Sequence, residues 1–338
     1  EVKIDDLSTG KRENVPGEAA FYEIDIRDKA LEKVFEEEKP QVVIHHAAHA
    51  NVTESVRNPG YDASVNIGGS INLFECCIRH DVEKIVFAST GGALYGEACY
   101  LPADESHPID PLSPYGVSKY AVELYLYAYR ENHGIEYVTL RYPNVDGPRQ
   151  DPHGEAGVVA IFSLQMLGGQ TPTIFGDGGK TRDYCYVGDI VDANILALSF
   201  AGTGTFNLGR GIEISDLEVF ESIQEAVGSN IQPNFAPVRP GEVEHIALAL
   251  QRSRVERLGV FLQLHLGHRL AAELLDGGDQ RVAVGLVVAL ELHGHIEHRL
   301  LQQAAAGAEL VGVDGFVFQA QRRLVDLQRL GEIGRQRL

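Results

Sequence analysis

The feature of this sequence that most constrains its fold is a regular alternation of short apolar runs with amphipathic stretches, up to about residue 210. The apolar runs, rich in β-branched residues, fall at 2–4, 41–45, 84–88 and 137–141. The stretches between them that resemble helices fall at 29–38, 59–79 and 114–132. Continuous apolar strands suit a parallel sheet that helices cover on both faces. The alternation therefore predicts an α/β fold with a doubly wound parallel sheet.

The composition changes near residue 255. Residues 255–338 contain no Lys, Pro, Tyr, Asn, Ser, Thr, Cys, Met or Trp. Turns and helix caps depend on several of these residue types. We therefore expect 259–338 to be an atypical tail, and we assign it no function. It is either an unusual helical tail or, as we favour, a shifted-frame translation joined near Gly259.

The chain is acidic, with 48 Asp and Glu against 29 Lys and Arg and a formal net charge of −19. Nucleic acids and anionic membranes bind basic surfaces, so we expect neither as a partner. No apolar run approaches the roughly 18 residues of a membrane span, and the first ten residues lack a signal-peptide pattern. Four cysteines without CxxC spacing indicate neither a disulfide framework nor a zinc site. We expect a reducing, cytoplasmic location.

Tyr115 and Lys119 are four residues apart on an expected helix, so their side chains share one face. An adjacent ammonium favours a phenolate and lowers the pKa of a tyrosine from its usual value of about 10. Tyr115 is therefore a candidate general base. Such a pair is also common by chance, as a half-buried tyrosine beside a solvated lysine. A second feature favours the catalytic interpretation of this pair. Thr90 ends an expected strand, and open α/β sheets place ligand-binding side chains at strand ends.

Together these motifs resemble the extended short-chain dehydrogenase/reductase family, over residues 2–259, and residues 88–96 are most similar to its UDP-glucose 4-epimerase branch. The resemblance implies a Rossmann-like sheet with a smaller α/β domain for a sugar nucleotide, and NAD as cofactor. The implied catalytic residues are Thr90, Tyr115 and Lys119. The implied cofactor-binding residues are Asp5, Asp25, Ile26, Ala47, Ala48, Asn66, Tyr115, Lys119 and Tyr142. The implied substrate-binding residues are Ser89, Asn144, Arg182, Arg239 and Glu242.

The domain boundaries follow from the same resemblance. We expect residues 1–142 and 186–210 to form the NAD-binding domain, and 143–185 with 211–258 to form the substrate domain. The family also implies a homodimer built on helices 59–79 and 114–132.

The implied reaction is inversion at C4 of a UDP-hexose, by transient oxidation, rotation of the keto sugar and return of the hydride. Related dehydratases carry an acid pair just after the strand-end threonine, whereas here Thr90 is followed by Gly91, Gly92 and Ala93. Two alternatives stay open. The chain is another sugar-nucleotide dehydratase, decarboxylase or epimerase of the family, or it is an inactive truncated product.

Two departures from the family pattern concern the Rossmann domain and the substrate side. An acidic ribose residue normally follows a G-x-G-x-x-G loop by about 20 residues, yet Asp5 is fifth and that motif does not occur in the sequence. We therefore expect the sheet to lack its first strand, with the phosphate loop and first helix, and to bind NAD poorly. Asp146 stands where the family usually has a bulky residue.

Two simpler interpretations are weighed against the resemblance. Arg182 would bind a diphosphate together with Arg239, but it could instead pair with Asp183 or Asp189 on the surface. His45 and His46 are neighbours in an expected strand and so point to opposite faces. We therefore expect no metal site there.

Overall fold

The computed structural model describes residues 1–152 and 157–249, all of which lie within one compact unit. Its main sheet is parallel and has the order β10-β5-β4-β3. The bounds of these strands are Val42–His45 for β3, Lys84–Thr90 for β4, Glu136–Tyr142 for β5 and Gly204–Asn207 for β10. The expectations for residues 259–338 lie outside the described residues.

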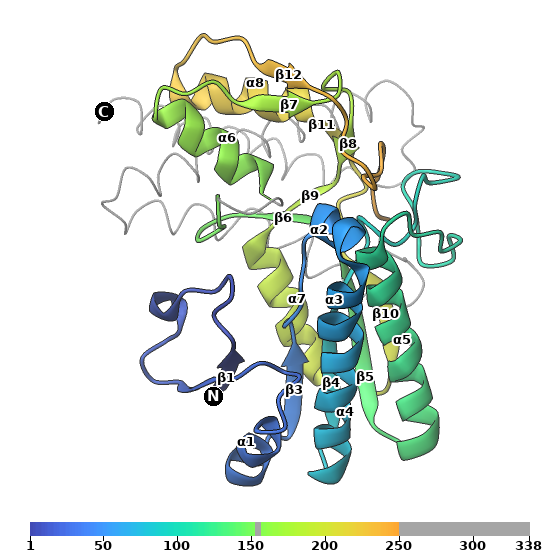
Figure 1. Ribbon diagram of the computed structural model, residues 1–338. Coiled ribbons are helices and arrows are strands. Elements are labelled where there is room, and N and C mark those ends of the chain that lie inside the picture. The colour runs from blue at the N-terminus through green and yellow to red at the C-terminus, as the bar shows by residue number, and fades with distance from the viewer. Residues whose placement is uncertain (153–156, 250–338) are drawn as a thin grey trace, which may run out of the picture. The chain divides into compact units, whose positions relative to one another are not determined.

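A second, two-stranded parallel sheet joins β1 (Val2–Asp5) to β2 (Ala20–Glu23). The usual order of this fold is 3-2-1-4-5-6. In that order β2 and β1 take the places of strands 3 and 2, and β3 takes the place of strand 4. Ile4 of β1 and Val43 of β3 pack against the same core cluster, but no hydrogen-bonded ladder joins the two sheets in the described residues. Figure 1 shows β1 beside β3 without a strand between them. The Rossmann-like fold is confirmed, with the sheet divided at the place of its first strand.

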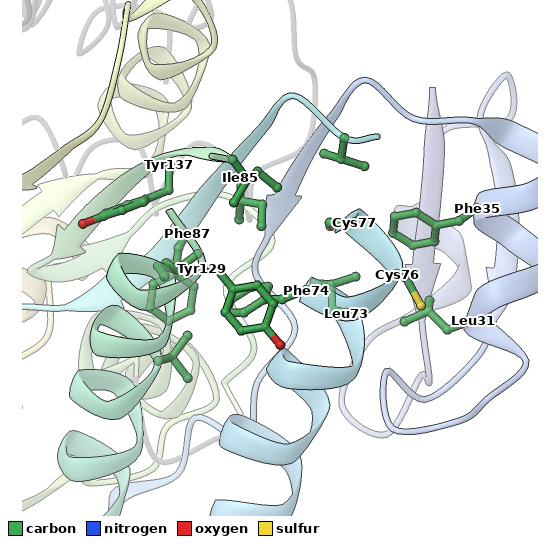
Figure 2. Packing of buried hydrophobic residues seen from close by; sticks show 14 residues of the cluster. Leu31, Phe35, Leu73, Phe74, Cys76, Cys77, Ile85, Phe87, Tyr129 and Tyr137 are labelled. Carbon is green, nitrogen blue, oxygen red and sulfur yellow. The ribbon is translucent and has the colours of Figure 1, made fainter. Parts of the chain in front are cut away.

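Helices cover the main sheet on both faces, as the apolar strands predicted. Every residue of β4 is buried. Ile85 and Phe87 belong to the core on one face and Val86 to the core on the other, as alternation along a strand requires. Figure 2 shows the first of these cores, where Phe74 and Tyr129 meet with ring centroids 5.5 Å apart.

The first core is covered by α1 (Leu31–Glu38), α4 (Ser70–Arg79) and α5 (Pro114–His133). Two short helices, α2 (Val52–Arg57) and α3 (Pro59–Ala63), pack against α5. A π-helical segment, η2 (Ser64–Gly69), joins α3 to α4, so the helix expected at 59–79 is continuous but locally widened. The short helix η1 spans Arg12–Asn14. The second core packs against α7 (Val187–Ser199).

The remaining elements contribute short paired strands and two helices. The strands are β6 (Asn144–Asp146), β7 (Thr173–Phe175), β8 (Thr181–Arg182), β9 (Tyr184–Tyr186), β11 (Ile214–Ser215) and β12 (Asn234–Ala236). They pair as β6 with β9, β7 with β12 and β8 with β11. Helices α6 (Val158–Leu167) and α8 (Asp216–Val227) pack together through Phe162 and Phe220. Our domain boundaries stay a prediction.

Local sequence explains where the key helices begin. The Ser113 side chain accepts a hydrogen bond from the Gly116 N–H, and Pro114 stands in the first turn. This cap and the proline explain why α5 begins at Pro114. A capping box formed by Ser215 and Glu218 begins α8. No helix in the described residues is long and apolar enough to cross a membrane.

Candidate active site

The candidate site lies at the carboxyl ends of β4 and β5, the edge where open α/β sheets bind ligands. Thr90 and Tyr142 are the last residues of these strands and are partners in the ladder. The Gly91 N–H donates to the Tyr142 carbonyl at 2.8 Å, which holds the turn after Thr90 against β5. The Thr90 hydroxyl accepts from the Ala93 N–H at 3.3 Å.

Helix α5 places Tyr115 in its first turn and Lys119 one turn later, beside this strand end. The Tyr115 N–H donates to the Ser55 hydroxyl at 3.2 Å. The buried Lys119 Nζ donates to the Ala88 carbonyl at 2.8 Å. It lies 4.9 Å from the centre of the Phe87 ring and 5.9 Å from that of Tyr115. The structure therefore brings Thr90, Tyr115 and Lys119 together.

The prediction that Lys119 lowers the pKa of Tyr115 below its usual value is wrong. Burial raises that pKa above its usual value, and the charge of Asp62 raises it further, while a hydrogen bond with Thr90 acts in the opposite direction. Burial also lowers the pKa of Lys119 to about 8, although Asp62 and Glu123 oppose this change. Spacing along a helix predicted proximity correctly, but it carries no information on desolvation.

Asp62, which the sequence analysis missed, is a fully buried carboxylate at the centre of a polar network. Its Oδ2 accepts from the Ser118 hydroxyl at 2.6 Å, and its Oδ1 accepts from Asn66 Nδ2 at 2.8 Å. Asn66 also bonds both the N–H and the carbonyl of His49, at 2.8 and 3.1 Å. Asn66 therefore fixes the loop after β3 that contains Ala47 and Ala48. The spacing of Asp62 and Asn66, four residues apart on a helix, is the signal that could have indicated this pair.

The two adjacent histidines point to opposite faces, as predicted. His45 is buried against Phe74 and Phe87, with its Nε2 2.9 Å from the Ser70 hydroxyl. His46 Nε2 instead lies 3.0 Å from the Tyr142 hydroxyl. No group of three metal-ligating side chains occurs in the part of the chain that the structure describes.

Three of the implied cofactor-binding residues lie at the ends of the first two strands: Asp5 is the last residue of β1, and Asp25 and Ile26 follow β2. Asp5 Oδ1 accepts from the Leu7 N–H at 2.7 Å. Asp25 is bonded by the backbone and guanidinium of Arg27, which lower the pKa of its carboxyl group. Ile26 is buried, and its carbonyl accepts from Asn72 Nδ2 at 2.7 Å. A carboxylate beyond a strand end is a suitable acceptor for ribose hydroxyls.

These groups fit NAD at both nucleoside ends. Asp5 and Asp25 would hold the adenosine end, while Tyr115 and Lys119 would hold the ribose near Thr90. Tyr142, also predicted to bind the cofactor, has a hydroxyl that accepts from Asn194 Nδ2 at 2.6 Å, and burial raises its pKa to about 12. The described residues contain no G-x-G-x-x-G turn to bind the pyrophosphate.

Ser89, predicted to bind substrate, lies inside a buried network. Its hydroxyl donates to Glu123 Oε1 at 2.6 Å. Arg141 donates to the same carboxylate from Nε at 3.0 Å and from a terminal nitrogen at 2.7 Å, and it also donates to the Tyr95 hydroxyl. This network ties α5 to β4 and β5 one turn beyond Lys119.

The other predicted substrate residues lie on the shorter elements. Arg182 donates to the carbonyls of Thr181 and Glu244, at 2.7 and 3.2 Å. Arg239 lies 3.7 Å above the Phe175 ring and 3.7 Å from Glu242. The Asn144 side-chain oxygen would lie 3.6 Å from a Cβ placed on Gly92, next to the turn after Thr90.

Lys180, which sequence analysis did not single out, is a third cation on these elements. Its Nζ donates to Glu242 at 2.8 Å and lies 3.3 Å from Asp216. Asp183 is occupied by the N–H groups of Arg210, Gly211 and Leu248. Its carboxylate is therefore already bonded, which disfavours the alternative that Arg182 pairs with Asp183.

Asp146, the second departure from the family pattern, is buried at the end of β6. Burial and the nearby Asp189 raise its pKa, Arg210 opposes the change, and the result is about 7. The Asp146 side chain is thus partly neutral at physiological pH.

Comparisons with known proteins agree with this geometry. Residues 2–209 match the model of the NAD-dependent epimerase/dehydratase family. A UDP-glucose 4-epimerase from Mycolicibacterium smegmatis is 43% identical over 276 residues, which are 80% of this chain and 88% of that relative.

Two solved structures share the fold. The Thermotoga maritima UDP-glucose 4-epimerase with UDP-glucose is 39% identical, with a TM-score of 0.75, and the match covers 87% of this chain and 91% of that one. The Thermus thermophilus UDP-glucose 4-epimerase complex with NAD is 41% identical, with a TM-score of 0.72 and coverage of 86% and 90%. This chain belongs to the NAD-dependent epimerase/dehydratase family.

Proposed function

We propose that this protein is an NAD-dependent UDP-glucose 4-epimerase, which inverts C4 of a UDP-hexose. The observation that carries the proposal is the convergence of Thr90, Tyr115 and Lys119 at one strand end, in a sequence that places glycines after Thr90. The UDP-glucose 4-epimerases that are similar to this chain in sequence and structure support the same activity.

Tyr115 is the group that accepts the proton of the 4-hydroxyl and later returns it. The Thr90 hydroxyl hydrogen-bonds the same oxygen and orients it. Lys119, whose pKa burial lowers to about 8, lies 5.9 Å from the centre of the Tyr115 ring and would bond the ribose of NAD beside Tyr115. NAD, when bound, supplies the acceptor and then the donor of the C4 hydride, so that no net oxidation occurs.

Inversion requires that the keto sugar turn over while the rest of the substrate stays bound. We propose that Arg182 and Arg239 hold the diphosphate, since guanidinium groups bind phosphate oxygens in paired hydrogen bonds. Glu242 is held by Lys180 beside Arg239. Asn144 would contact the sugar side.

Elimination of water is the competing reaction within the family. It needs an acid and a base beside the strand-end threonine, and Gly91, Gly92 and Ala93 supply neither. The buried Glu123 is bonded to Ser89 and Arg141 and so is not available for that role. We therefore favour epimerisation.

The proposal extends to assembly and location. Helix α5 exposes apolar side chains, which suit an interface between two copies; they are Val117, Leu124, Tyr125 and Tyr127. All four cysteines are free thiols, as is usual in the cytoplasm.

The test is turnover of UDP-galactose by the chain with excess NAD⁺, alongside a form extended before Glu1 by a glycine-rich strand–turn–helix segment. We expect UDP-glucose as the product. A 4-keto-6-deoxy sugar nucleotide as the product would instead identify a dehydratase. A folded, NAD-loaded extended form that turns over neither way would refute the proposal.

A further inference from the structure

Asp62 lies where two parts of the candidate site meet. Through Ser118 it contacts the helical turn of α5 that also contains Tyr115 and Lys119. Through Asn66 it is linked to the backbone of His49, in the loop after β3. The carboxylate thus accepts one hydrogen bond from each side, and both bonds are shorter than 3 Å.

The charge of this carboxylate is unusual for its position. Asp62 is fully buried, and in the described residues no Lys or Arg forms an ion pair with it. The only ionisable partner within ion-pair distance there is His49, whose Nδ1 lies 3.8 Å from Asp62 Oδ1 and makes no hydrogen bond. A buried, unpaired carboxylate is costly to a folded protein. Its presence beside the candidate base calls for a role.

We propose that Asp62 is a positioning residue for the epimerisation, which anchors the Tyr115–Lys119 turn to the loop after β3 and sets a buried negative charge against the Lys119 ammonium. This inference rests on the proposed function. Asp62 touches neither Tyr115 nor Lys119 through a hydrogen bond in the described residues, so it acts through Ser118 and through its charge.

The negative charge of Asp62 opposes the effect of burial on the pKa of Lys119. Burial lowers the pKa of Lys119, while Asp62 on α3 and Glu123 on α5 raise it. Burial lowers the pKa values of His45 and His46, and the positive charge of Lys119 lowers them further. Both imidazoles are therefore neutral. The negative charge near Lys119 therefore comes from Asp62 and Glu123, and Glu123 is already paired with Arg141.

The direction of the effect of removing this charge can be worked out. Asp62 raises the pKa of both Tyr115 and Lys119. Without its charge, Tyr115 loses its proton at lower pH, and so does Lys119. If activity needs the Tyr115 phenolate and the Lys119 ammonium, both limbs of the pH profile move toward lower pH. A loss of packing alone would lower the rate without moving either limb.

The experiment compares the pH dependence of kcat for UDP-galactose in the wild type, Asp62→Asn and Ser118→Ala, with NAD⁺ in excess and in both the original and the extended chain. For Asp62→Asn we expect both limbs to move down by about one pH unit. The matched variant Ser118→Ala removes the same anchor but keeps the charge. We expect its kcat/KM to fall about tenfold with the limbs unmoved.

The outcomes separate this inference from the proposed function. If the wild type is folded and NAD-loaded but inactive, the proposed function fails. If the wild type is active and the Asp62→Asn profile keeps both limbs in place, only the role of Asp62 fails. If Asp62→Asn does not fold, Asp62→Ser removes the charge with a smaller side chain; limbs that move toward lower pH support the role, and limbs that stay in place contradict it.

Discussion

Replacing Arg141 by Met should lower the free energy of unfolding, because it breaks the buried network that positions α5. Arg141 and Glu123 are each only 7% exposed at their side chains, and two hydrogen bonds join them. Removing one partner of a buried ion pair costs about 3–5 kcal/mol, because the other charge stays buried. The Ser89 hydroxyl still donates to Glu123 in the variant, so we expect the lower end, about 3 kcal/mol.

Urea unfolding followed by circular dichroism measures this change. With a slope near 3 kcal/mol per M, the midpoint should fall by about 1 M. The matched double variant, Glu123→Gln with Arg141→Met, should regain part of the stability. A midpoint within 0.2 M of the wild type would refute the reasoning.

Two further predictions concern ligands. The extended chain should retain more NAD after purification than residues 1–338, because Asp5 and Asp25 can hold adenosine but no described turn binds the pyrophosphate; equal NAD content would contradict this. Arg239→Ala should raise KM for UDP-galactose about tenfold or more with a smaller change in kcat, since it removes a charged contact to the diphosphate. Arg12→Ala, which removes the cation–π pair with Phe21, is its control, and a KM equal to that of the control would oppose the assignment.

Much of the fold could be predicted because residues close together in the sequence determine where its strands and helices form. The helix expected at 114–132 is α5 (Pro114–His133), and the apolar run at 84–88 is the fully buried β4. The separation of β1 and β2 from the sheet β10-β5-β4-β3 was not predicted. The π-helical segment around Asn66 was not predicted, because it depends on contacts with the loop after β3.

The site was predicted less completely, because its chemistry depends on burial and on contacts distant in sequence. The spacing of Tyr115 and Lys119 indicated a shared helix face, but the direction of the Tyr115 pKa shift depends on desolvation, which spacing does not report. The family resemblance implied that Ser89 binds substrate, and this stays a prediction. The hydrogen bond from its hydroxyl to Glu123, 34 residues away, could not be read from the sequence. Asp62 was missed for the same reason.

The most direct test of this account is the turnover of UDP-galactose by the Tyr115→Phe variant of the extended, NAD-loaded protein. Phenylalanine keeps the ring but removes the group that takes the 4-hydroxyl proton, and loss of a positioned acid or base costs about 10²–10⁴-fold in rate. Tyr127→Phe, which changes an exposed tyrosine of the same helix, is the matched control. We expect Tyr115→Phe to lose turnover while still binding UDP, and Tyr127→Phe to retain both. Near-wild-type turnover by Tyr115→Phe would contradict the account.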